Sequence, residues 1–149
     1  MIKKKIIIFL FLLSSCGYQP IFVDSKSNKL IFKEIELTGE KNINRKIISI
    51  SGLKEDSQNF TYSKLKIDSK KRIIETSKNA KGQANSFKTT VEINLTIEDV
   101  NNKITSKSFD ESFSYNNIEN KFELSEYQNE VETILVNKIF EKLIIYFNL

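Results

Sequence analysis

The only cysteine in the chain, Cys16, is the residue best placed for covalent chemistry. Ser14 and Ser15 precede it, and an uninterrupted apolar run at residues 6–13 precedes them. The sequence contains no histidine, so no imidazole can activate Cys16 as a nucleophile. The same absence excludes a Ser-His-Asp triad and the commonest zinc-ligand sets. We therefore expect no catalytic activity and no metal or other cofactor.

The residues before Cys16 follow the order of a secretory signal peptide. Three lysines, Lys3 to Lys5, come first, then the apolar run of residues 6–13, then small residues. The run is too short to cross a bilayer core, which takes about 20 apolar residues. We interpret residues 1–15 as a signal peptide. The alternative, a short buried strand or helix, does not explain why three lysines adjoin it.

The charge balance of the chain is basic mainly because of these lysines. The sequence has 23 Lys and Arg against 19 Asp and Glu. Without Lys3, Lys4 and Lys5, 20 basic residues face 19 acidic ones. A nucleic-acid-binding domain usually carries its excess of cations on the folded surface. We therefore expect no nucleic-acid partner.

Leu13-Ser14-Ser15-Cys16 resembles the lipobox of bacterial lipoproteins. The resemblance implies that Cys16 becomes the first residue of the mature chain, with a diacylglycerol on its sulfur and an acyl group on its nitrogen. Several acyl chains anchor a protein stably, whereas one does so only marginally. Residues 16–29 contain Gly17, Pro20 and a polar stretch, and we interpret them as a lipidated tether. The alternative for Cys16 is a free thiol packed in the core.

Residues 30–149 carry the patterns of a single folded domain. Residues 30–37 predict a strand whose buried face holds Ile31, Ile35 and Leu37. The next segment predicts a helix that is capped by Asn42 and ends at Gly52. Apolar residues recur at helical spacing within it, at Ile43, Ile47 and Ile50.

Three extended segments follow this helix. Residues 58–77 fit either one bent strand or a hairpin, and the sequence leaves both open. Residues 87–98 alternate strictly, with a buried face made of Phe87, Thr89, Val91, Ile93, Leu95 and Ile97. After a turn at residues 99–103, residues 104–115 alternate as well. The last two segments therefore predict an antiparallel hairpin.

Residues 126–147 predict a long helix. Ser125 and Gln128 match a capping box, and Glu126, Glu130 and Glu132 place negative charge where the helix dipole favours it. The first apolar stripe consists of Tyr127, Val131, Ile134 and Leu135. A broader apolar arc follows towards residue 147. We interpret this arc as core, the alternative being a contact with a partner protein or membrane.

These elements predict an α+β two-layer sandwich. Its mainly antiparallel sheet has about four strands, and two helices pack on one face. The order along the chain is strand, helix, three strands, helix.

The stretch after the lipobox resembles the opening of the lipopolysaccharide-assembly lipoproteins of the LptE family. The matching residues are Cys16, Gly17, Tyr18, Gln19, Pro20, Ile21 and Phe22. The resemblance implies an outer-membrane lipoprotein on the periplasmic face. It also implies that the protein supports assembly of an LptD-type β-barrel and plugs its lumen, where lipopolysaccharide is inserted into the outer leaflet. Gly17 agrees with this location, since an aspartate after the cysteine is associated with inner-membrane retention.

Contact with lipopolysaccharide would require cations that meet its phosphates. The densest cationic cluster after the tether comprises Lys64, Lys66, Lys70, Lys71 and Arg72. We take Lys66, Lys70, Lys71 and Arg72 as the candidate lipopolysaccharide-binding residues. The alternative is a solvated turn, because lysine is the common surface residue of this sequence.

Two other classes of function remain open. One is a different envelope lipoprotein, such as an auxiliary subunit of a lipid transporter or a pilot protein for a secretin. The other is a tethered hydrolase with paired carboxylates, for which Glu119, Glu123, Glu126 and Glu130 have helical spacing. We do not expect this hydrolase, because the helix dipole and solvent explain the acidic residues and no nucleophile accompanies them.

Overall fold

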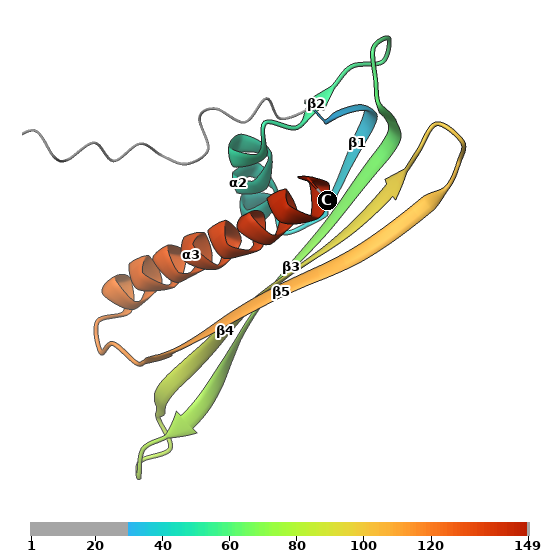
Figure 1. Ribbon diagram of the computed structural model, residues 1–149. Coiled ribbons are helices and arrows are strands. Elements are labelled where there is room, and N and C mark those ends of the chain that lie inside the picture. The colour runs from blue at the N-terminus through green and yellow to red at the C-terminus, as the bar shows by residue number, and fades with distance from the viewer. Residues whose placement is uncertain (1–29, 149) are drawn as a thin grey trace, which may run out of the picture.

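The computed structural model describes residues 30–148, and its helices and strands follow the expected order with one additional short strand. The elements are β1 (Ile31–Gly39), α2 (Lys41–Ser51), β2 (Lys54–Glu55), β3 (Tyr62–Lys78), β4 (Ala84–Glu98), β5 (Ile104–Asn116) and α3 (Lys121–Asn148) (Figure 1). The signal peptide, the lipid-attachment residue and the tether predicted within residues 1–29 lie outside the described residues.

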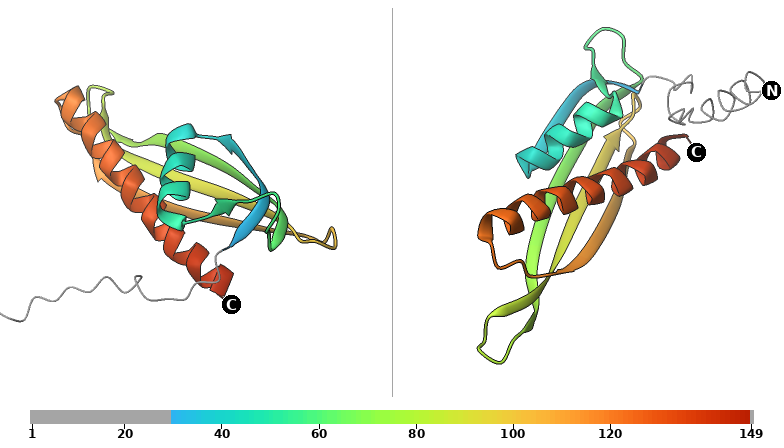
Figure 2. Two further views of the ribbon diagram at one scale, coloured as in Figure 1. Left: turned by 90° about the horizontal axis from the view of Figure 1, so that it is seen from above. Right: turned by 90° about the vertical axis from the view of Figure 1, so that its left-hand side faces the viewer.

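The strands form one mixed sheet in the order β2-β1-β3-β4-β5. β1 runs parallel to β2 and β3, whereas β3, β4 and β5 pair with one another in antiparallel fashion. Parallel neighbours need a crossover connection, and α2 supplies it between β1 and β3. Both helices lie on the same face of the sheet (Figure 2). The predicted two-layer α+β sandwich is confirmed, with the two-residue β2 as an additional strand.

β4 is the central strand of the antiparallel part, and its predicted buried face is confirmed. Its buried residues are Thr89, Val91, Ile93, Leu95 and Ile97, with Phe87 partly buried. The Asp99 carboxylate accepts hydrogen bonds from the N–H groups of Asn101 (2.7 Å) and Lys103 (2.9 Å). These bonds shape the predicted turn into β5.

Residues 58–77, for which a bent strand and a hairpin were both open, form one long strand from Tyr62 onward. β3 pairs with β4 over most of its length, with irregular register between Glu75 and Lys78. The hairpin of β3 and β4 extends beyond both helices (Figure 2). The sheet therefore has an uncovered arm at this end.

The predicted buried face of β1 is confirmed only in part, since Ile35 packs against the core beside Leu65 of β3. Phe32 is fully buried, whereas Leu37 is 43% exposed. The chain after α2 returns to β1, where the N–H of Asp56 bonds to the carbonyl of Phe32 (2.9 Å). The Phe32 ring also stacks on Tyr62 (5.3 Å between centroids). Contacts with segments distant in sequence thus decide which β1 side chain is buried.

Helix α2 begins earlier than the sequence indicated. Glu40 occupies the N-cap position without a side-chain cap, and Asn42 lies inside the helix, so the predicted cap is wrong. The predicted stop is confirmed, because Gly52 has the left-handed conformation (φ 63°) that ends many helices. Ile43 and Ile47 are buried in the core, and Ile50 is 38% exposed.

Helix α3 begins at Lys121 and not after Ser125. The Asn120 carboxamide oxygen accepts the N–H of Phe122 (2.9 Å), and its nitrogen donates to Glu123 (3.1 Å). These hydrogen bonds replace the predicted capping box. Ile134 is 52% exposed, so its place in the predicted buried stripe is also wrong. The buried side of the helix consists of Val131, Glu132, Leu135, Val136, Ile139 and Leu143.

A buried polar network joins β1 to α2 where Gly39 passes β3. The Ser69 hydroxyl is fully buried, accepts the N–H of Glu40 (3.1 Å) and donates to the carboxamide oxygen of Asn44 (2.8 Å). The carboxamide nitrogen of Asn44 donates to the carbonyl of Thr38 (2.9 Å). Buried polar groups need such partners, and here they fix where β1 ends and α2 begins.

Candidate functional site

The structure separates the predicted cationic cluster onto two faces of the sheet. Lys66, Lys70 and Arg72 lie on the open face, which no helix covers, whereas Lys71 reaches helix α3 on the other side. The cause is the alternation of side chains along a strand, because β3 continues through residues 69–72 as one strand and forms no turn there. The five cations therefore do not form one surface.

Carboxylates accompany the cations of the open face. Glu36 of β1 pairs with Lys64 (2.9 Å) and Lys66 (3.1 Å). Lys70 lies 3.8 Å from Asp68, and Arg72 lies 3.6 Å from Glu92. Hydrogen bonds from Lys64 and Lys66 lower the pKa of Glu36, and the bond to Glu36 raises the pKa of Lys64. Exposed pairs of this kind contribute little to stability, so the row chiefly balances the surface charge.

An ionic triad lies between the sheet and the helices. The carboxylate of Glu132 in α3 accepts hydrogen bonds from Lys46 of α2 (2.7 Å) and Lys71 of β3 (2.6 Å). Glu132 is only 2% exposed. Burial would raise its pKa, but the hydrogen bonds from both lysines outweigh burial and hold the pKa below its ordinary value. Glu132 is therefore ionised at neutral pH and joins three elements of the fold.

This triad is not predicted from the sequence, where Glu132 fits the helix dipole and Lys71 fits a cationic surface. A signal was nevertheless present, because Glu132 directly follows Val131 and lies three residues before Leu135, within the buried side of the helix. A carboxylate at such a position needs a cationic partner. The sequence could not name Lys46, which is 86 residues away.

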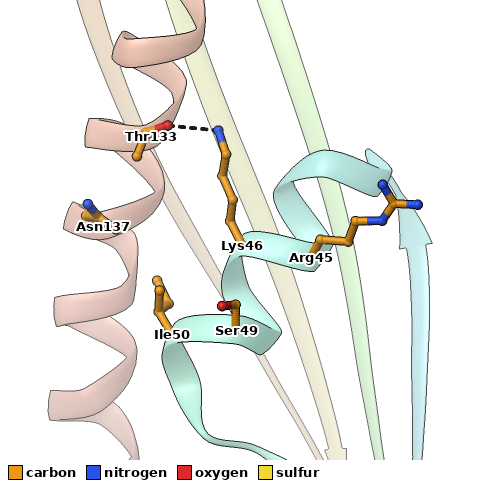
Figure 3. Close-up of a pocket in the computed structure, with 6 residues that line it drawn as sticks. All are labelled: Arg45, Lys46, Ser49, Ile50, Thr133 and Asn137. Carbon is orange, nitrogen blue, oxygen red and sulfur yellow. Dashed lines mark hydrogen bonds between the residues drawn. The ribbon is translucent and has the colours of Figure 1, made fainter.

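A groove of about 310 Å³ opens between α2 and α3, beside this triad. Its lining consists of Arg45, Lys46, Ser49, Ile50, Thr133 and Asn137 (Figure 3). The amine of Lys46 donates to the Thr133 hydroxyl (2.8 Å), and the guanidinium of Arg45 points away from α3 (Figure 3). The groove is thus lined by the aliphatic parts of side chains and by a few polar groups. The charged group of Lys46 is bonded to Thr133, and that of Arg45 points away from the groove.

Within residues 30–148, no three acidic or cysteine side chains gather in a way that would hold a metal ion. Glu126 and Glu130, considered above for a hydrolase, are both exposed on α3. No helix in this part of the chain is long and apolar enough to cross a membrane.

No protein-family model and no curated protein sequence matches this chain. Solved structures do match it. Rare lipoprotein B from Shewanella oneidensis has a TM-score of 0.53 at 9% identity, over 76% of this chain and 95% of that protein. The chain shares its fold. A minor lipoprotein from Acinetobacter baumannii (TM-score 0.51, 10% identity) matches over 76% of this chain and 87% of its own.

Lipoprotein B from Nitrosomonas europaea gives a similar result. Its TM-score is 0.51 at 9% identity, over 80% of this chain and 89% of that protein. At such low identities the similarity establishes the arrangement of helices and strands. It carries over no site residue, since sites vary on a shared fold.

Proposed function

We propose that this chain is a lipid-anchored protein of the outer membrane, on its periplasmic face. There it supports assembly of an LptD-type β-barrel, plugs the lumen and so assists insertion of lipopolysaccharide into the outer leaflet. It catalyses no reaction and needs no cofactor. Residues 1–15 are the signal peptide, Cys16 carries the lipid, and residues 30–149 form the functional domain.

The observation that carries this proposal is the fold shared with lipoproteins over 76% of the chain. This fold comes from residues after the tether, whereas the lipobox and the motif beginning at Cys16 come from residues 13–22. Two separate parts of the chain thus favour a lipoprotein. The assignment to barrel assembly rests on the motif at residues 16–22.

The open face of the sheet suits a polar enclosure. Lys64, Lys66, Lys70 and Arg72 have carboxylate partners within the chain, and Thr96 and Ser106 bond to each other across β4 and β5 (3.2 Å). The lumen of an outer-membrane barrel is polar. Because these cations already form ion pairs within the chain, the open face can contact the inner wall of a barrel without burying an unpaired charge.

Substituting Cys16→Ala should abolish lipidation and recovery of the barrel. The test purifies tagged full-length protein from detergent-solubilised outer membranes and identifies partners and the mature N-terminus by mass spectrometry. We expect wild type to carry a lipid on Cys16 and to bring down a β-barrel, with at least about a tenfold loss for the variant, because anchoring needs the acyl chains. Ser25→Ala, in the tether, is the matched control.

Other outcomes of this experiment would contradict the proposal. Recovery of inner-membrane transporter subunits would indicate a lipid-transporter auxiliary subunit, and recovery of a secretin would indicate a pilot protein. An unmodified thiol at Cys16 in the native host would remove the lipid anchor itself.

Lipopolysaccharide contact is the second part of the proposal, with Lys66, Lys70 and Arg72 as its cations. Lys71 is not one of them, because it forms an ion pair with Glu132 between the sheet and helix α3. Replacing these three cations by Gln should weaken binding to purified lipopolysaccharide about tenfold, given roughly 1 kcal/mol for each cation near an anionic lipid surface, less the share held by neighbouring carboxylates. A triple Gln variant at the exposed Lys81, Lys121 and Lys138 is the control. Unchanged binding would remove this site.

A further inference from the structure

One end of the sheet carries both the beginning of the folded chain and an exposed apolar turn. Ile104 lies opposite Glu98, Glu98 opposite Lys64, and Lys64 opposite Glu34, so these four residues form one row across the sheet. Leu30 precedes Glu34 by four residues, beyond this row. The chain therefore leaves the domain towards Cys16 at the end where β4 turns into β5.

This turn exposes two aliphatic side chains. Val100 is 58% exposed and Ile104 is 65% exposed. The Phe60 ring lies at the same end, in the loop before β3, and Lys33 sits 5.8 Å from its centroid. Isolated exposed apolar residues are common, but two of them flanking one tight turn give the turn an apolar tip.

Most acidic groups of this end are held by the backbone. Asp99 accepts two N–H groups within the turn, and Asp56 accepts those of Gln58 (2.8 Å) and Asn59 (3.1 Å), which lower its pKa. Glu55 accepts the N–H of Ile35 (3.1 Å). Among residues 30–148, Lys33, Lys54 and Lys103 of this end have no carboxylate within 4.0 Å. Lysines without a carboxylate partner can pair with lipid phosphates.

Chain length selects this end and not the opposite one. Residues 16–29, fully stretched, reach at most about 50 Å. The domain is about as long, since the 17 residues of β3 extend for roughly 56 Å. The opposite end also exposes apolar groups, with Ile74 at 55% and Phe122 at 70%. A fully stretched tether would fall short of the tip of the arm, so the anchor brings the end that holds Leu30 and Val100 nearest to the membrane.

We propose that the β4–β5 turn is a membrane-contact tip, with Val100 and Ile104 inserted among the lipid headgroups. This inference rests on the lipid anchor at Cys16 and adds an orientation of the domain to it. Inserting two aliphatic side chains stabilises that orientation, while Lys33, Lys54 and Lys103 lie at the depth of the phosphates. The opposite end, with the arm of β3 and β4, then points away from the lipid headgroups around the anchor.

The chain contains no tryptophan, so single-tryptophan variants can report the depth of each position without background. Lipidated full-length Val100→Trp and Ile104→Trp are reconstituted into phosphatidylethanolamine–phosphatidylglycerol vesicles with brominated acyl chains. We expect quenching at least about threefold stronger than for Ile74→Trp and Phe122→Trp, since bromine acts only at short range and the tip lies within about 10 Å of the acyl boundary. The control positions have similar exposure at the other end.

Each outcome has one meaning. Stronger quenching at both tip positions supports the membrane-contact tip. Equal quenching at all four positions in protein that has entered the vesicles overturns it while leaving the lipid anchor intact. If the protein fails to enter vesicles and mass spectrometry finds no lipid on Cys16, the proposed function fails, and the tip fails with it. Circular dichroism confirms that each variant is folded.

Discussion

Glu132→Gln is expected to destabilise the domain by about 3 kcal/mol, the lower part of the range for breaking a buried ion pair. The substitution keeps the size of the side chain but leaves Lys46 and Lys71 facing each other without a counter-ion. The two lysines are 33% and 26% exposed, so they reach water in part and the loss stays below the upper limit. Urea-induced unfolding, followed by circular dichroism, measures the change.

Two comparison variants separate the triad from a general effect of charge. Glu126→Gln removes the same charge from an exposed position on the same helix and should cost less than about 0.5 kcal/mol. Replacing Lys46, Lys71 and Glu132 together by Met should leave stability within about 1 kcal/mol of wild type, because it removes the desolvation cost of all three ions. Equal losses for Glu126→Gln and Glu132→Gln would contradict this account.

The same carboxylate predicts a dependence of stability on pH. The pKa of Glu132 is below its ordinary value of 4.5 in the folded state. Its contribution is therefore fully present above pH 4.5 and is lost as the pH falls through the lower, folded-state pKa. The free-energy difference between wild type and Glu132→Gln should shrink in this acidic window. A difference that stays constant down to about pH 2 would show that Glu132 does not titrate as part of the triad.

The parts of the fold that the sequence predicted are those with a simple periodic pattern. β4 alternates because one face meets the helices and the other meets solvent, so its pattern of two residues revealed Val91, Ile93 and Leu95. The start of α3 was missed because two capping patterns compete. Asn120 with Glu123 and Ser125 with Gln128 are both plausible, and the side-chain hydrogen bonds select the first.

The candidate site was harder to predict because it depends on contacts between distant segments. Lys71 belongs to a cationic run in the sequence, yet strand alternation turns it towards Glu132 and leaves Lys70 and Arg72 on the open face. In the same way, Phe32 is buried by a segment that returns after α2. Local sequence patterns do not show which charged side chains will pair in the fold. The spacing of the lysines therefore overestimated the number of cations on one surface.

Gly39→Ala is expected to cost about 2 to 6 kcal/mol, because backbone strain and overpacking each contribute about 1 to 3 kcal/mol. Gly39 has a φ of +86°, which L side chains rarely adopt, and an added Cβ would lie 1.9 Å from the carbonyl oxygen of Ser69. That oxygen belongs to the backbone of β3 and accepts the N–H of Glu40 (3.1 Å), so it cannot move away without breaking the junction of β1 and α2.

Gly82→Ala isolates the steric part of this effect. Gly82 also has a positive φ, of 78°, but nothing lies within 4 Å of the position its Cβ would take. It should therefore cost only about 1 kcal/mol, from backbone strain alone. The difference between the two variants in the free energy of unfolding, measured with urea, gives the cost of the steric contact with Ser69. An equal loss of stability for both variants would contradict this account. It would mean that β1 and β3 can separate at Gly39 without a cost in free energy, and that the Ser69–Asn44 network does not fix the start of α2.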